Sequence, residues 1–104
     1  MKLVRDLIPA IILEAGKTPE WRYTRSREEY ADLLAQKVVE ELKEYMGTLT
    51  YDEAVEEAGD LYEVFRTLLS VKGISVEHAR EAAEEKRQSR GGFKAGIVLK
   101  SVRE

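Results

Sequence analysis

The sequence predicts an all-α fold, a helical bundle of two long antiparallel helices with shorter helices beside them. Both prolines of the 104-residue chain, Pro9 and Pro19, lie in its first fifth, so the strongest helix breaker is absent from residue 20 onward. Apolar residues then recur at helical spacing between glycines, which commonly end helices. With 43% hydrophobic residues in so short a chain, we expect residues 1–104 to form a single domain. The glycines at the joints are Gly16, Gly47, Gly73, Gly91 and Gly92.

A short helix is predicted near the N-terminus. It should run from about Asp6 or Leu7 to Ala15, with Asp6 as a candidate N-cap and Pro9 in the tolerated first turn.

Two segments favour extended chain over helix. Over residues 18–25, Trp21 and Tyr23 alternate with polar neighbours after a proline. Near the C-terminus, the apolar run over residues 97–99 also favours an extended conformation. The two segments could form a small terminal β pairing.

Serine and threonine caps mark the starts of the remaining helices. Ser26 with Glu29, and Thr50 with Glu53, have the spacing of capping boxes. The connection between the two long helices is short, which favours antiparallel packing. The helices that begin at these caps are expected to end near Met46 and Lys72, and a fourth helix to run from after Ser75 to about Arg90.

Composition excludes several classes of protein. Twenty acidic and 17 basic side chains give a net charge of −3, which argues against nucleic acid or an anionic membrane as a partner bound through global charge. The absence of cysteine excludes disulfides, thiolate nucleophiles and cysteine-based metal sites. No apolar run approaches the roughly 18 residues of a membrane span, and the N-terminus lacks a signal-peptide core. We expect a soluble, cytoplasmic protein.

Acidic residues lie on the apolar face of the second helix. On a helical wheel with Leu34 at zero, Glu41 falls at roughly −20°, between Tyr30 and Leu34. Glu44 falls at roughly −80°, at the edge of the apolar stripe, and Glu40 at roughly −120°, further toward solvent.

The third helix repeats this pattern. With Glu57 at zero, Val64 and Leu68 fall roughly 20° to either side, and Asp60 lies near −60°. Each acidic pair is spaced three residues apart, so antiparallel packing would make the two pairs face each other. A buried, unpaired carboxylate costs several kcal/mol, so the four acids need a cation or an opening to water.

Carboxylate ligands alone favour Mg²⁺ or Mn²⁺ over zinc or copper. A di-iron carboxylate bundle is the competing site, but it uses Glu-x-x-His motifs. The single histidine, His78, has Ser75 three residues before it, so we exclude di-iron and interpret His78 as an ordinary first-turn residue.

Four motifs together resemble a known family. Residues 40–44 (EELKE) and 57–60 (EAGD) match the EExxE and ExxD motifs of the MazG-like, all-α nucleoside triphosphate pyrophosphohydrolases, a superfamily that includes phosphoribosyl-ATP pyrophosphohydrolase. The opening, residues 2–9 (KLVRDLIP), is similar to that of a small stand-alone branch, and residues 86–93 (KRQSRGGF) resemble its KxxxRGGF signature.

The resemblance implies hydrolysis of a nucleoside triphosphate between its α and β phosphates, in a branch described as removing non-standard nucleotides. By motif position, Glu41, Glu44, Glu57 and Asp60 would be the Mg²⁺ ligands, and Glu40 a residue that orients water or acts as a base. Phosphoribosyl-ATP pyrophosphohydrolase is the alternative within the same fold. A nucleotide-binding or helical interaction module without turnover is the alternative from another class.

Basic residues are needed to hold phosphate oxygens that the metal does not contact. Lys86 and Arg90 lie four residues apart on the fourth helix, on the stripe of its apolar residues, and are predicted to do so. The alternative is that they interact with the helix dipole at its C-terminal end.

Two further basic residues are candidates for phosphate contacts. Arg5 could bind phosphate, or form a surface ion pair with Asp6 or another acid. Lys37 could also bind phosphate, or neutralise Glu41 one turn along the helix.

We expect a homodimer or homotetramer. Tyr62 and Leu69 lie roughly 120° to 140° from Glu57 on the third helix, outside the stripe that one partner helix would cover. Another surface must therefore bury them, and members of the resembled superfamily commonly assemble as dimers or tetramers.

Overall fold

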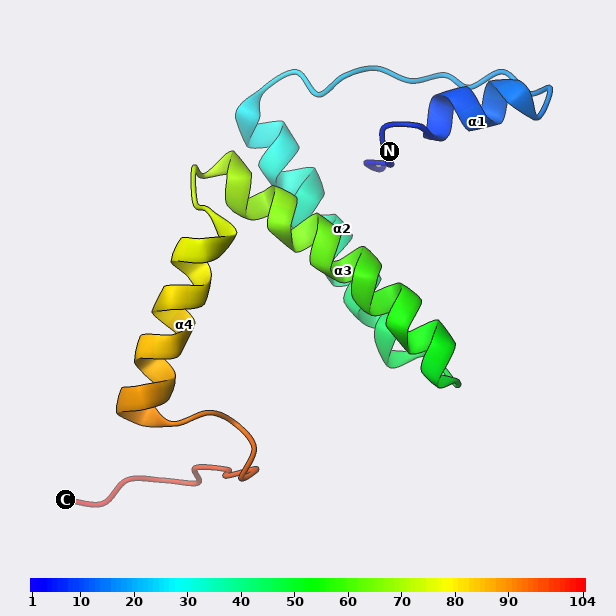
Figure 1. Cartoon of the computed structure of the whole chain (residues 1–104). Helices are drawn as coiled ribbons and strands as arrows, with labels where there is room; N and C mark the ends of the chain where they lie inside the picture. The colour runs from blue at the N-terminus through cyan, green and yellow to red at the C-terminus, as the bar shows by residue number, and fades with distance from the viewer. The chain divides into compact units, whose positions relative to one another are not determined.

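The computed structural model describes residues 1–104 and contains four helices and no strand, which confirms the all-α prediction (Figure 1). The chain divides into two compact units, residues 1–73 and 74–104. The helices are α1 (Ile8–Glu14), α2 (Arg27–Met46), α3 (Tyr51–Val71) and α4 (Val76–Arg90).

The predicted caps start both long helices. Ser26 Oγ accepts a hydrogen bond of 3.0 Å from the backbone N–H of Glu29, and Thr50 Oγ1 accepts one of 3.2 Å from that of Glu53. The two glutamates reach back in turn to the N–H of the residue before each cap, at 2.9 and 3.2 Å. Each helix start is therefore fixed by local hydrogen bonds that the sequence alone specifies.

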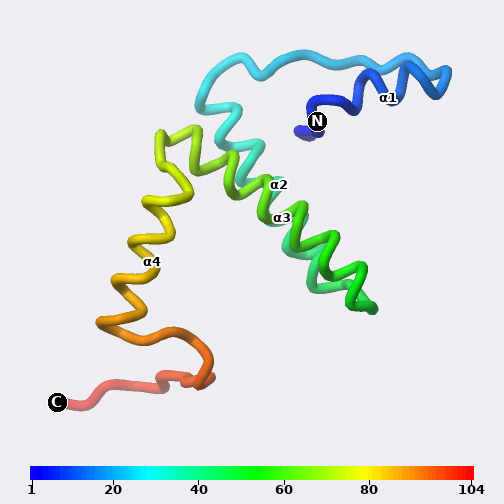
Figure 2. Tube along the Cα trace, viewed as in Figure 1, coloured from blue at the N-terminus to red at the C-terminus, as the bar shows by residue number.

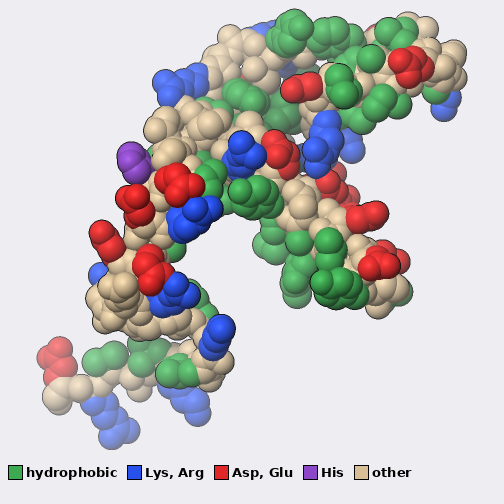
Figure 3. Space-filling model, in the orientation of Figure 1, with side chains coloured by type: hydrophobic (Ala, Val, Ile, Leu, Met, Phe, Trp, Pro, Cys, Tyr) green, Lys and Arg blue, Asp and Glu red, His purple; other side chains and the backbone are tan.

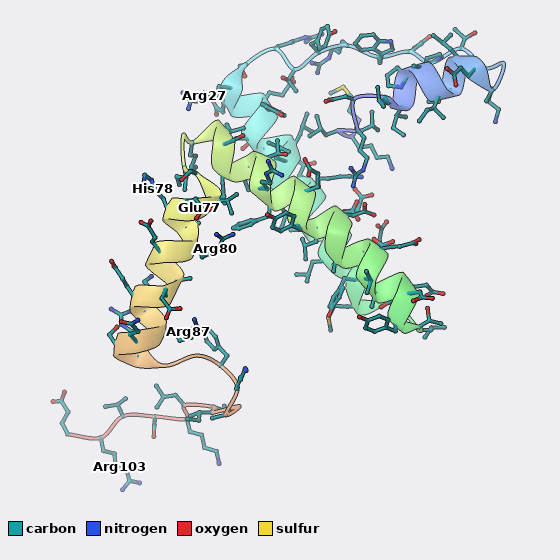
Figure 4. All side chains as sticks on the ribbon, viewed as in Figure 1. Arg27, Glu77, His78, Arg80, Arg87 and Arg103 are labelled. Atoms are coloured by element: carbon teal, nitrogen blue, oxygen red, sulfur yellow. The ribbon has the colours of Figure 1, made fainter.

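Helices α2 and α3 pack against each other as an antiparallel hairpin, as predicted (Figures 1 and 2). The connection that joins them, residues 47–50, is short, which favours this arrangement. At the other end of the hairpin, Arg27, labelled in Figure 4, donates a hydrogen bond of 2.9 Å from Nε to the carbonyl of Val71. A covalent connection at one end and a hydrogen-bonded arginine at the other hold the two helices together.

The N-terminal helix differs from the prediction in its cap. Its N-cap is Leu7, whose side chain makes no capping hydrogen bond, so the assignment of Asp6 as the cap was wrong. Pro9 occupies the first turn, where the missing N–H costs nothing, and its fixed φ starts this short helix without a side-chain cap.

The predicted terminal β pairing is also wrong, because the structure contains no strand. Residues 18–25 are extended but are held by side chains. The ring of Trp21 packs edge-on against Tyr23 at 5.1 Å between centroids, and Arg22 donates to the carboxylate of Glu29 at 2.8 and 2.9 Å. The apolar run over residues 97–99 is exposed.

The second unit consists of α4 and the residues that flank it. Ser75 caps the helix by accepting a hydrogen bond of 3.1 Å from the N–H of His78, which confirms that His78 lies in its first turn. Glu77 pairs with Arg80 at 2.9 Å along the exposed surface of α4 (Figure 4). The helix ends at Gly91, whose φ of +85° a side chain would strain.

The hairpin leaves much of its apolar surface open. Leu34 is buried, at 2% exposed, whereas Leu42 and Phe65 are 46% and 49% exposed. Figure 3 shows hydrophobic side chains gathered on the hairpin. No helix is long and apolar enough to cross a membrane. The residues that line the open apolar groove are Val38, Leu42, Tyr45, Ala58, Leu61, Tyr62 and Phe65.

Candidate active site

Three carboxylates converge between α2 and α3. Glu41 and Glu44 come from α2 and Glu57 from α3, and one oxygen of each lies within 4.8 Å of the other two. The spacing of three residues places both α2 acids on one side of that helix, and antiparallel packing brings Glu57 opposite them. We call these three residues the acidic cluster.

The cluster lies partly inside the hairpin. Glu41 is 6% exposed, comparable with Leu34, and is therefore buried on the apolar face where its wheel position placed it. Glu57 is half-buried, and Glu44 is exposed. Oε2 of Glu41 and Oε2 of Glu57 are both buried and accept no hydrogen bond. Such oxygens are costly in a folded protein unless a proton or a cation compensates them.

Burial and mutual repulsion raise the pKa values of two of these acids. The pKa of Glu41 lies above its ordinary value because of burial and then because of Glu44, and Lys37 opposes the shift. Burial, Glu41, Glu44 and the charge of Asp60 raise the pKa of Glu57 to about 7. Near neutral pH the acidic cluster is therefore partly protonated, unless a metal ion takes the place of the protons.

Lys37 supplies one positive charge at the edge of the cluster. Its Nζ lies 3.4 Å from an oxygen of Glu41 and 3.4 Å from one of Glu40, and its side chain is only 18% exposed. Burial lowers the pKa of Lys37, but the charges of the two glutamates outweigh this effect and leave it raised. In this structure Lys37 forms an ion pair with Glu41, which is the contact of the second of its two predicted roles.

Asp60 lies outside the acidic cluster. Its Oδ1 accepts a hydrogen bond of 2.6 Å from Nη2 of Arg5. The structure therefore brings together three of the four predicted metal ligands, whereas the fourth, Asp60, forms an ion pair with an arginine. Arg5 thus makes the surface ion pair that was its alternative role.

Lys2 is a further basic residue near the site, and the motifs did not predict it. Its Nζ lies 3.8 Å from Glu40, the predicted water-orienting residue. The signal was its place in the same opening motif as Arg5, residues 2–9, which places two basic residues three apart. Through these two residues the N-terminal segment contacts both α2 and α3.

Lys86 and Arg90 belong to the second unit. Both side chains are exposed on α4, and neither forms an ion pair. Their predicted contact with phosphate stays a prediction.

A comparison with protein families adds independent evidence. A sequence model of the phosphoribosyl-ATP pyrophosphohydrolase family matches residues 4–87, which include α1, α2, α3 and both acidic motifs. The chain belongs to this family. Phosphoribosyl-ATP pyrophosphohydrolases are part of the MazG-like all-α superfamily, so the resemblance drawn from the motifs is confirmed. No curated protein and no solved structure matches the chain.

Family membership identifies the chain as a pyrophosphohydrolase, a hydrolase that acts on an acid anhydride. Of the two enzyme readings of the sequence, it supports the phosphoribosyl-ATP alternative better than a general nucleoside triphosphate hydrolase. A phosphoribosyl-ATP substrate is highly negative, and so is the acidic cluster, so the cluster would repel it unless a cation lay between acid and phosphate.

Proposed function

We propose that this protein is a metal-dependent pyrophosphohydrolase that cleaves a phosphoribosyl-ATP-like nucleoside triphosphate between its α and β phosphates. Water attacks the α phosphorus, the bond from that phosphorus to the bridging oxygen breaks, and pyrophosphate leaves. The observation that carries this proposal is the acidic cluster, in which two buried oxygens have no partner and one pKa is raised to about 7.

The residues present fit a hard divalent cation. All donors of the cluster are carboxylate oxygens, which suit Mg²⁺ or Mn²⁺, and the unpartnered oxygens of Glu41 and Glu57 lack the positive charge that such an ion brings. Glu41, Glu44 and Glu57 would hold the ion, and Asp60 would join them once free of Arg5. When bound, the ion neutralises phosphate charge and makes hydroxide available from water near neutral pH.

The chain's own residues complete the proposed site. Glu40 lies beside the cluster, between Lys2 and Lys37, where its carboxylate can accept a hydrogen bond from the attacking water and orient it. Lys37 and Arg5 carry donors that could turn from carboxylate to phosphate oxygens, because both classes of acceptor are anionic. Lys86 and Arg90, on the second unit, are proposed to contact phosphate oxygens.

The reaction is tested by product analysis with phosphoribosyl-ATP and Mg²⁺ in ¹⁸O-labelled water. We expect pyrophosphate and a monophosphate that carries the label, because the α phosphorus is attacked. Label in pyrophosphate would contradict attack at that position, and inorganic phosphate as the primary product would reject the proposal. Glu41→Gln should lose turnover, whereas Glu56→Gln, which removes an exposed carboxylate of α3 outside the cluster, should retain it.

The motifs at the two ends of the sequence favour a second substrate class, the non-standard nucleoside triphosphates. The opening motif, residues 2–9, and the RGGF signature, residues 90–93, are similar to those of the stand-alone branch, and the signature lies outside the matched residues 4–87. The two substrate classes can be distinguished by measuring kcat/KM for phosphoribosyl-ATP and for a panel of standard and modified nucleoside triphosphates. Preference for a modified triphosphate would favour removal of non-standard nucleotides, and tight binding without turnover would favour a non-catalytic module.

The role of α4 in binding phosphate has its own test. Arg90→Ala should weaken triphosphate binding and slow turnover but leave the affinity for Mn²⁺ nearly unchanged, because its guanidinium is not among the proposed metal ligands. A loss of Mn²⁺ affinity in this variant, measured by calorimetry, would contradict the assignment.

The open apolar groove supports a homo-oligomer, a dimer or a tetramer. Leu42 and Phe65 face solvent over about half of their surface, and an exposed apolar patch of this kind is typical of an interface between proteins. We propose that a second copy covers the groove. Since free nucleotides are cytoplasmic metabolites, the cytoplasm is the compartment expected for this activity.

A further inference from the structure

The segment before α1 reaches across the hairpin at the acidic cluster. Lys2 contacts Glu40 of α2 at 3.8 Å, and Arg5 contacts Asp60 of α3 at 2.6 Å. The carbonyl of Arg5 accepts a hydrogen bond of 3.0 Å from the N–H of Ile8, which fixes the arginine backbone at the start of α1. We call residues 1–7 the N-terminal strap.

Arg5 and a divalent cation would compete for Oδ1 of Asp60. A guanidinium 2.6 Å from Oδ1 occupies the position on that oxygen that a cation would take, and two cations so close would repel each other. The acidic cluster next to Asp60 has a deficit of positive charge, because Oε2 of Glu41 and Oε2 of Glu57 have no partner.

The contact between Arg5 and Asp60 is weak enough to exchange. The two side chains are 60% and 40% exposed, and exposed ion pairs of this kind contribute little to stability because water screens them. A compact divalent ion held by several carboxylates at once can therefore displace a single guanidinium. A second contact of the same segment, between Lys2 and Glu40, is longer and also exposed.

We propose that the N-terminal strap is a built-in competitor for the metal site, in which Arg5 gives up Asp60 when a divalent cation binds and is then free to contact the triphosphate. This inference rests on the proposed metal-dependent function. Arg5 lowers the affinity for metal, and by reciprocity metal releases Arg5. The released guanidinium carries paired donors that match phosphate oxygens, so metal and substrate bind cooperatively.

The test is calorimetry of Mn²⁺ binding to four proteins, with the chain otherwise intact. Arg5→Gln should bind Mn²⁺ about three- to fivefold more tightly than the wild type, the factor that corresponds to an exposed ion pair of up to about 1 kcal/mol. Lys2→Gln is the matched control, because it removes the same charge from the same strap but frees Glu40, which is outside the cluster. It should change the affinity for Mn²⁺ by less than about twofold. Arg5→Lys should resemble the wild type.

A second measurement reports on the wild type directly. In a Mg²⁺ titration followed by NMR, the side-chain guanidinium resonance of Arg5, assigned with Arg5→Lys, should move toward that of a free arginine as the site fills. An unchanged resonance at saturation would overturn the proposal, as would unchanged or weaker Mn²⁺ binding by Arg5→Gln. Equal gains in Arg5→Gln and Lys2→Gln would also overturn it, since general charge alone would then explain them. Failure of the wild type to bind Mn²⁺ at all would instead reject the proposed metal site, and the competition with it.

Discussion

Glu57 should release a proton when metal binds, and the size of this release follows from its pKa of about 7. A carboxylate must be ionised to serve as a ligand, so bound metal displaces the proton. With that pKa, Glu57 holds about 0.9 proton at pH 6, about 0.5 at pH 7 and about 0.1 at pH 8. The apparent affinity for Mg²⁺ should therefore fall about tenfold between pH 8 and pH 6. The raised pKa of Glu41 acts in the same direction.

Calorimetry of Mg²⁺ binding in buffers of different ionisation enthalpy measures this release. The wild type should release most of one proton, or more, at pH 6 and little at pH 8. Glu57→Gln should bind Mg²⁺ more weakly and release fewer protons, because it lacks the negative charge and the titrating proton of the Glu57 carboxyl. Glu56→Gln, an exposed neighbour on α3, should behave as the wild type. A wild-type affinity independent of pH between 6 and 8, with no proton released at pH 6, would refute the reasoning.

Three further outcomes are expected. The folded state binds the Glu57 proton more tightly than the unfolded state, so the protonated carboxyl contributes stability below about pH 4.5, and this contribution is lost as the pH rises toward about 7. In EDTA, Glu57→Gln should therefore melt at a higher temperature than the wild type at pH 8 but not at pH 4, as measured by circular dichroism. Thr50→Ala removes the capping bond of 3.2 Å and should cost about 1 kcal/mol in urea unfolding, with an unchanged midpoint contradicting the role of the cap. Phe65→Asp should dissociate the proposed oligomer in light scattering, and a wild-type monomer at micromolar concentration would contradict the oligomer itself.

The sequence by itself determined the long helices and most of the acidic cluster. Ser26 and Thr50 cap α2 and α3 because capping depends on atoms within three residues along the chain. A connection of four residues makes the helices antiparallel, and helical periodicity then fixes which side chains face each other. The convergence of Glu41, Glu44 and Glu57 follows from these two local rules.

Only the tertiary structure decided which partners the remaining charged side chains take. Asp60 has the same periodicity as the cluster residues, yet it pairs with Arg5, which is 55 residues away in the sequence. No spacing rule reports that contact, because it depends on the path of an irregular segment across the hairpin. The terminal β pairing failed for a related reason: strand propensity is realised only where a partner strand is available, whereas a capped helix satisfies its hydrogen bonds within itself. Local interactions depend on neighbouring residues and can be predicted from the sequence, whereas long-range ion pairs depend on the path of the folded chain.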